Sequence, residues 1–186
     1  MNNIYMTTIP TITTERLILR PFTLADAPDV QKLAGSFEIA DTTMNMPHPY
    51  PDGAAESWIG THQKTWELGS GLTLAITLKD SGQLIGAIGL TISKDHSRAE
   101  VGYWVAVPYW GKGFCTEAAR ALLDFGFSEL KLNRIYATHL IRNPASGKVM
   151  QKIGMKYEGC LRQHVKKWDK FEDLAYYGTL AGEYIK

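Results

Sequence analysis

The sequence has few cysteines, no long apolar run and almost no net charge, and each of these features excludes a class of protein. Its 2 cysteines, Cys115 and Cys160, are too few for a disulfide framework and are not spaced as metal ligands, so we predict no metal site. No stretch approaches the ~20 apolar residues of a membrane span. No basic segment followed by an apolar run marks a signal peptide. We therefore expect a cytoplasmic protein with no membrane partner.

The charge balance excludes a further kind of partner. The 20 Lys and Arg residues oppose 19 Asp and Glu residues, which gives a formal net charge of +1. Because nucleic-acid-binding proteins carry a basic excess, we expect no nucleic-acid partner. The chain of 186 residues, 45% hydrophobic and 21% charged, has the composition of a globular protein. No repeat or linker divides it, so residues 1–186 are expected to form one domain with a core of about 13–182.

The hydrophobic pattern predicts a mixed α/β fold. Apolar residues alternate in the predicted strands and recur at helical spacing in the predicted helices, and Thr23 with Asp26 predicts a capping box. The proline-rich stretch 38–53 is expected to be a loop. The predicted strands are 14–22, 72–78, 83–92, 98–107, 134–141 and two near the C-terminus, and the predicted helices begin at Thr23 and cover 54–68, 116–130 and 145–153. The order β-α-α-β-β-β-α-β-α-β-β predicts an α+β fold in which helices flank a mainly antiparallel central sheet.

A glycine-containing turn joins the strand at 98–107 to the helix at 116–130. Its sequence, Gly111-Lys112-Gly113, does not fit the P-loop, which needs a longer loop before its lysine. It does not fit the dinucleotide fingerprint either, because the preceding strands form an antiparallel meander. Backbone N–H groups of this turn would still surround a pyrophosphate at the positive end of the helix. Glycine lets the backbone approach a phosphate closely, and Lys112 adds a full charge.

At this turn, YWGKGFCTEA (109–118) resembles the pyrophosphate loop of the GNAT N-acetyltransferases, and in particular that of the RimJ/RimL branch, which acetylates N-terminal amines of ribosomal proteins. Five other segments resemble the same branch and occur in the expected order: TERLILRPF (14–22), HPYP (48–51), AEVGYWV (99–105), NPASGKVMQKIGM (143–155) and FEDLAYYG (171–178). The resemblance covers essentially the whole chain. It implies the GNAT fold, acetyl-CoA as the co-substrate in a V between two central strands, and an amine acceptor, either a protein N-terminus or a small molecule.

The resemblance also implies which residues hold acetyl-CoA. Backbone groups of 105–107 would pair with the pantetheine arm and the acetyl carbonyl, the turn would hold the pyrophosphate, and Asn143 would bind the pantetheine amide. The implied contacts are Val105, Ala106, Val107, Gly111, Lys112, Gly113, Phe114, Cys115, Thr116, Asn143 and Ser146. The chain departs from the common family pattern at three positions. Trp110 stands where the family has Gln or Arg, and Cys115 stands where it has Gly or Ala. Met150 stands where many members have a proton-donating tyrosine.

Two residues are predicted to act in catalysis. The resemblance to the RimJ/RimL type implies that Ser146 assists the departing thiolate, and the alternative is that Asn143 and Ser146 only cap a helix. Glu100 lies on the strand that leads to the thioester and would accept the amine proton through water. The alternative for Glu100 is an ion pair on the sheet face with Arg98 or Arg134.

The acceptor is expected to bind near the proline-rich loop, where the family shapes its acceptor pocket. His48 and Tyr50 are the candidate substrate contacts, with an exposed loop position as the alternative for His48, and His139 is predicted to be a core residue. These features together predict an acetyl-CoA-dependent N-acetyltransferase that works by direct attack in a ternary complex. The alternative is a non-catalytic CoA-binding or regulatory module on the same fold. Exposed strand edges near the C-terminus could support a homodimer.

Overall fold

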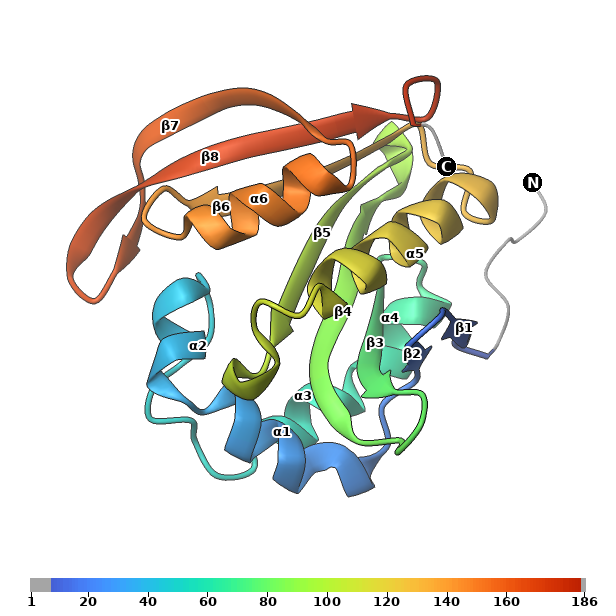
Figure 1. The fold of residues 1–186 in the computed structure, drawn as a ribbon, viewed down its shortest axis with the longest axis vertical. Helices are drawn as coiled ribbons and strands as arrows, with labels where there is room; N and C mark the ends of the chain where they lie inside the picture. The colour runs from blue at the N-terminus through green and yellow to red at the C-terminus, as the bar shows by residue number, and fades with distance from the viewer. Residues whose placement is uncertain (1–7, 185–186) are drawn as a thin grey trace.

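The computed structural model describes residues 8–184, which are built around one eight-stranded sheet (Figure 1). The strands lie in the order β1-β2-β3-β4-β5-β6-β8-β7. Every neighbouring pair is antiparallel except β5 and β6, which run parallel. The strands are β1 (Ile12–Thr13), β2 (Leu17–Arg20), β3 (Gly71–Leu78), β4 (Leu84–Ser93), β5 (Arg98–Val105), β6 (Arg134–Leu140), β7 (Lys156–Lys167) and β8 (Lys170–Leu180). The predicted mixed fold with a mainly antiparallel sheet is confirmed.

Helices cover both faces of this sheet. They are α1 (Ala27–Ala34), α2 (Phe37–Thr42), α3 (Ala54–Gly60), α4 (His62–Glu67), α5 (Phe114–Ser128) and α6 (Pro144–Lys152). The larger apolar cluster packs under α5 and α6, and the smaller one under α1, α2 and α3. Side chains alternate along β3, so Leu74 and Ile76 belong to the larger cluster while Ala75 belongs to the smaller one. All three are 0% exposed, because helices cover both faces of β3 here.

The two central strands separate partway along their length. β5 and β6 are paired only from Arg98 opposite Arg134 to Glu100 opposite Tyr136. Beyond that point β5 stays paired with β4 as far as Val105, whereas β6 stays paired with β8. Each strand is therefore held by its outer neighbour, and a V-shaped opening forms between them. α5 is the next helix after β5, beyond the glycine turn, and α6 begins shortly after β6, which brings both helix starts to this opening.

Some element boundaries differ from the prediction. The expected loop 38–53 contains α2, in which Ser36 accepts a hydrogen bond from the Ile39 N–H at 3.4 Å, and Ile39 is buried. The expected helix 54–68 is divided into α3 and α4 at Thr61, whose hydroxyl and N–H both donate to the Trp58 carbonyl. This competition with the helical ladder explains the break. The β5 strand ends at Val105, before a 3-10 turn at Val107–Tyr109.

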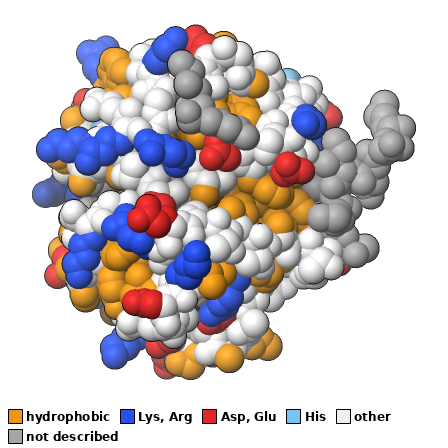
Figure 2. Space-filling model, turned by 45° about the vertical axis from the view of Figure 1, so that its right-hand side comes forward, with side chains coloured by type: hydrophobic (Ala, Val, Ile, Leu, Met, Phe, Trp, Pro, Cys, Tyr) orange, Lys and Arg blue, Asp and Glu red, His pale blue; other side chains and the backbone are white. Residues whose placement is uncertain are grey.

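Positive and negative side chains are interspersed on the face of the molecule drawn in Figure 2, as the near-zero net charge would suggest. None of the helices within residues 8–184 is both long enough and apolar enough to cross a bilayer. Within the same residues, no group of three His, Cys, Asp or Glu side chains is arranged to hold a metal ion.

Candidate active site

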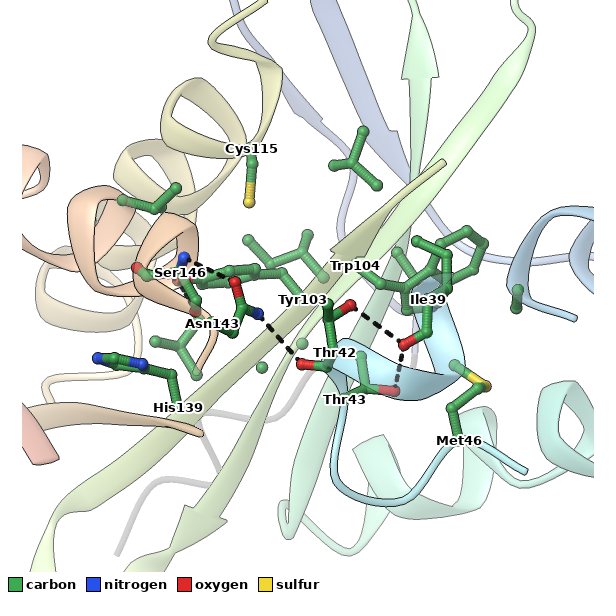
Figure 3. Close-up of a pocket in the computed structure, with 18 of the residues that line it drawn as sticks. Ile39, Thr42, Thr43, Met46, Tyr103, Trp104, Cys115, His139, Asn143 and Ser146 are labelled. Carbon is green, nitrogen blue, oxygen red and sulfur yellow. Dashed lines mark hydrogen bonds between the residues drawn. The ribbon is translucent and has the colours of Figure 1, made fainter. Parts of the chain in front are cut away.

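A cavity of about 930 Å³ lies at the opening between β5 and β6. Its walls come from two sides, which Figure 3 shows: Cys115, Asn143 and Ser146 lie on the side of α5 and α6, whereas Ile39 and Met46 lie on the side of α2. The strands β3 to β6 contribute the floor. The cavity thus connects the two faces of the sheet.

The glycine turn lies at one end of this cavity, where Gly111 and Gly113 take left-handed backbone conformations with φ of +74° and +82°. Most L-residues adopt this region only at a cost of about 1–2 kcal/mol, which explains the glycines. Gly113 is the N-cap of α5. The first N–H groups of a helix have no acceptor within the helix, so they are free for an anion at the positive end of the dipole.

A salt bridge from the segment between β1 and β2 supports this turn from outside. Arg16 Nε donates to Glu117 Oε2 at 2.7 Å, and Arg16 Nη1 donates to the Lys112 carbonyl at 3.1 Å. Burial alone would raise the pKa of Glu117, but hydrogen bonds from Thr14 and Arg16 lower it overall, so the carboxylate stays ionised. Sequence reasoning missed Arg16 because 101 residues separate it from Glu117 and no local pattern links them.

The strand end that the pantetheine arm was expected to follow already makes hydrogen bonds within the protein. The Val105 carbonyl accepts from the Trp110 indole N–H at 2.5 Å, and the Ala106 N–H donates to the Ile85 carbonyl at 2.8 Å. The Val107 carbonyl accepts from the Trp110 backbone N–H at 3.1 Å. Each carbonyl oxygen keeps a second lone pair, so this segment can still accept a ligand donor. Trp110, which stands where the common family pattern has Gln or Arg, therefore stabilises the end of β5 through these hydrogen bonds.

The start of α6 lies on the same side of the cavity. The Asn143 side-chain carbonyl accepts from the Ser146 N–H at 3.4 Å, so the capping predicted for this segment is present. The Asn143 amide also donates to the Thr42 carbonyl at 3.1 Å and thereby joins α6 to α2 across the cavity. The cap fixes the first turn of α6 and, with it, the position of Ser146.

Ser146 has a partner that the sequence reasoning did not single out. The Tyr103 hydroxyl lies within hydrogen-bond distance of two Ser146 atoms, Oγ at 3.0 Å and the carbonyl oxygen at 3.2 Å. Burial raises the pKa of Tyr103, so its phenol stays protonated. Burial also raises the pKa of Cys115 to about 12. A thiol that stays protonated is a poor nucleophile, so Cys115 is poorly suited to a covalent role.

Glu100 lines the cavity from the opposite face of the sheet. Its Oε1 accepts a hydrogen bond from Thr138 Oγ1 at 2.9 Å, across the point where β5 and β6 separate. The alternative ion pair with arginine is not formed among residues 8–184: Arg134 pairs with Glu158 instead, and Arg98 makes no salt bridge to Glu100. The carboxylate therefore faces the cavity and accepts from a neutral hydroxyl rather than from an arginine.

The other singled-out residues divide between cavity and surface. Tyr50 lines the cavity, whereas His48 is exposed, does not line it, and has Nδ1 3.1 Å from the Gly35 carbonyl. His139 is 9% exposed, with Nδ1 2.8 Å from the Leu140 carbonyl, which confirms the expectation of a core residue with a partner. The structure thus brings Tyr50, but not His48, to the cavity.

Residues 42–47 close the cavity on the side of α2 and are tied to the far end of the chain. Lys167, only 8% exposed, donates to two carbonyls of this segment at 2.9 and 3.3 Å. Asp41, just before it, accepts from Arg142 at 2.7 Å and from the Trp168 indole at 2.8 Å. The wall is therefore held by the β7–β8 hairpin, which no local sequence pattern indicated.

The comparisons with known proteins agree with this geometry. The acetyltransferase (GNAT) domain family matches residues 16–156. The uncharacterized N-acetyltransferase p20 of Bacillus licheniformis is 33% identical over 176 residues, which cover 94% of this chain and 98% of that protein. A GNAT-family acetyltransferase from Bacillus anthracis has a similar structure, with a TM-score of 0.83, 26% identity, and coverage of 94% of this chain and 100% of that chain.

A RimJ structure from Mycobacterium smegmatis in complex with CoA-disulfide has the same fold, with a TM-score of 0.84, 23% identity, and coverage of 95% of this chain and 90% of that chain. The expected RimJ/RimL resemblance is thereby found among the structural neighbours. From the matched domain and the full-length relative, the chain belongs to the GNAT family of acetyl-CoA-dependent N-acetyltransferases.

Proposed function

We propose that this enzyme transfers the acetyl group of acetyl-CoA to a primary amine, on a protein N-terminus or a small molecule, by direct attack in a ternary complex. The observation that carries the proposal is the opening between β5 and β6. Glu100 lines it from one face of the sheet, and Ser146 lies at it on the other face. Two substrates that enter from opposite faces would meet within this opening without a covalent enzyme intermediate.

Acetyl-CoA is proposed to lie along the α5 and α6 side. The free N–H groups at the start of α5 and the Lys112 ammonium would bind the pyrophosphate. The pantetheine arm would follow the end of β5 toward Asn143. The proposed contacts are Val105, Ala106, Val107, Gly111, Lys112, Gly113, Phe114, Cys115, Thr116, Asn143 and Ser146, most of which line the cavity.

The chemistry needs a neutral amine, a stabilised oxyanion and a protonated leaving group. An α-amine with a pKa near ~8 is partly neutral at pH 7, and Glu100 would take the remaining proton through water as the C–N bond forms. Backbone N–H groups near the end of β5 would stabilise the developing oxyanion. As the C–S bond breaks, the Ser146 hydroxyl would donate a hydrogen bond to the thiolate. A thiol with a pKa near ~8.5 needs little more help to leave.

The first test is a calorimetric titration with acetyl-CoA, followed by a thiol-release assay over short peptides and small amines. We expect binding together with turnover on at least one amine, and a lower kcat for Ser146→Ala with an unchanged Kd for acetyl-CoA. Binding without turnover on any amine would support the non-catalytic CoA-binding module instead. The absence of binding would contradict the assignment of the glycine turn.

A further inference from the structure

Tyr103 is an ionisable side chain that reaches Ser146, a proposed catalytic group, from the strand side of the cavity. It lies on β5 and packs against the larger apolar cluster, whereas its neighbour on the same strand, Glu100, faces the opposite side of the sheet. Its hydroxyl is 3.0 Å from Ser146 Oγ and 3.2 Å from the Ser146 carbonyl. Two contacts to one residue fix the Tyr103 hydroxyl relative to the first turn of α6.

The direction of the Ser146 hydroxyl decides whether it can assist a thiolate. A serine hydroxyl has one proton to donate and two lone pairs that accept. A serine in the first turns of a helix can donate its proton to a backbone carbonyl one turn earlier. In that orientation the proton is not available to a ligand. The Tyr103 phenol has one proton for two acceptors, and Ser146 Oγ is the nearer of them, at 3.0 Å against 3.2 Å for the carbonyl. When this proton is donated to Ser146 Oγ, it occupies a lone pair and favours a serine proton that points into the cavity.

We propose that Tyr103 is a positioning residue, which holds the Ser146 hydroxyl so that its proton points at the departing sulfur of CoA. This inference rests on the role proposed above for Ser146. Tyr103 itself transfers no proton in this scheme. Its phenol stays protonated, since burial raises its pKa, and a protonated phenol is what a hydrogen-bond donor to Ser146 requires. The chain thus has a tyrosine near the leaving group, although Met150 occupies the position where the family often has one.

The test is a double-mutant cycle with Tyr103→Phe, Ser146→Ala and the double variant, in steady-state kinetics with an amine that the wild-type enzyme acetylates. One neutral hydrogen bond corresponds to roughly a three- to tenfold effect. Tyr103→Phe should lower kcat by about that factor, with the Kd for acetyl-CoA and the KM for the amine within about twofold of wild type. The double variant should be no slower than Ser146→Ala, because Tyr103 acts only through Ser146.

Tyr177→Phe is the matched control. It removes one phenol oxygen from a side chain that is 8% exposed and accepts from Gln151 at 3.3 Å, away from the cavity lining. If Tyr103 had only a structural role, Tyr103→Phe and Tyr177→Phe would both lower the melting temperature and would have the same kcat. Equal kcat in the two variants would therefore overturn the inference.

Two further outcomes would overturn it in distinguishable ways. If the losses from Tyr103→Phe and Ser146→Ala multiply in the double variant, Tyr103 acts independently of Ser146, and the proposed role of Ser146 survives. If Ser146→Ala turns over at the wild-type rate while Tyr103→Phe is slow, the leaving-group role of Ser146 fails together with the inference. In that case acetyl-CoA binding and turnover by the wild-type enzyme would still support the proposed acetyl transfer.

Discussion

Replacing His62 by phenylalanine should remove an acid-sensitive weakness from the fold. His62, at the start of α4, is 6% exposed, and neither ring nitrogen has a hydrogen-bond partner among the described residues. Its ring packs 4.5 Å from Trp58 and 5.5 Å from Phe22, measured between ring centroids. Burial lowers the pKa of His62 from 6.5 to about 4, because an imidazolium at this position would be desolvated and unpaired.

The magnitude follows from proton linkage. In the unfolded chain His62 binds a proton near pH 6.5, whereas in the folded protein it does so only near pH 4. The folded state therefore has its full stability above pH 6.5 and loses part of it as the pH falls toward 4. Each pH unit between these values corresponds to about 1.4 kcal/mol. At pH 5 the loss is about 2 kcal/mol, and below pH 4 it reaches at most about 3.4 kcal/mol. The first figure corresponds to a drop of roughly 4–8 °C in melting temperature.

The assay is urea unfolding at pH 7.5, 6 and 5 for wild type and His62→Phe. We take the free energy of unfolding of the variant minus that of wild type. This difference should be about 2 kcal/mol larger at pH 5 than at pH 7.5. Carboxylates that titrate in both proteins cancel in this difference. His96→Gln, at an exposed position, is the control and should behave like wild type. A constant difference between wild type and His62→Phe across this range would refute the reasoning.

Three further predictions concern the site. Glu100→Gln should lower kcat by about 10²-fold, with acetyl-CoA binding unchanged, as a lost general base would; an unchanged kcat and pH profile would remove Glu100 from that role. Gly113→Ala forces an L-residue to a φ of +82° and should lower the free energy of unfolding by about 1–2 kcal/mol and weaken acetyl-CoA binding in calorimetry. Gly60→Ala, in α3 and with open space around the new Cβ, should do neither. Lys167→Met removes two hydrogen bonds to residues 42–47 and should raise the KM for the amine while the Kd for acetyl-CoA stays the same. A higher Kd for acetyl-CoA would contradict the proposal that the amine binds on the α2 side and acetyl-CoA on the α5 and α6 side.

Local rules were sufficient for several parts of this protein. The Asp26 carboxylate accepts the Thr23 N–H at 2.7 Å, as the capping box predicted, because the two residues are three positions apart on one turn. Gly111 and Gly113 could be predicted to form a tight turn, since their left-handed φ values suit glycine. The strand alternation gave the mixed sheet. The helix at 37–42 was missed because the proline-rich residues that follow it dominate the local pattern, although Ser36 is a recognisable N-cap.

The sequence by itself therefore determined the turn, the caps and the alternation, because each depends on residues a few positions apart along the chain. Only the tertiary structure decided which side chains meet in the cavity. Tyr103 reaches Ser146 across 43 residues, Thr138 reaches Glu100 across 38, and Asp41 meets Trp168 across 127. The physical reason is that alternation assigns each residue to a face of its strand but does not specify which residue of another element lies opposite. That choice comes from strand pairing, which here holds β5 and β6 together for three residue pairs and then lets them separate.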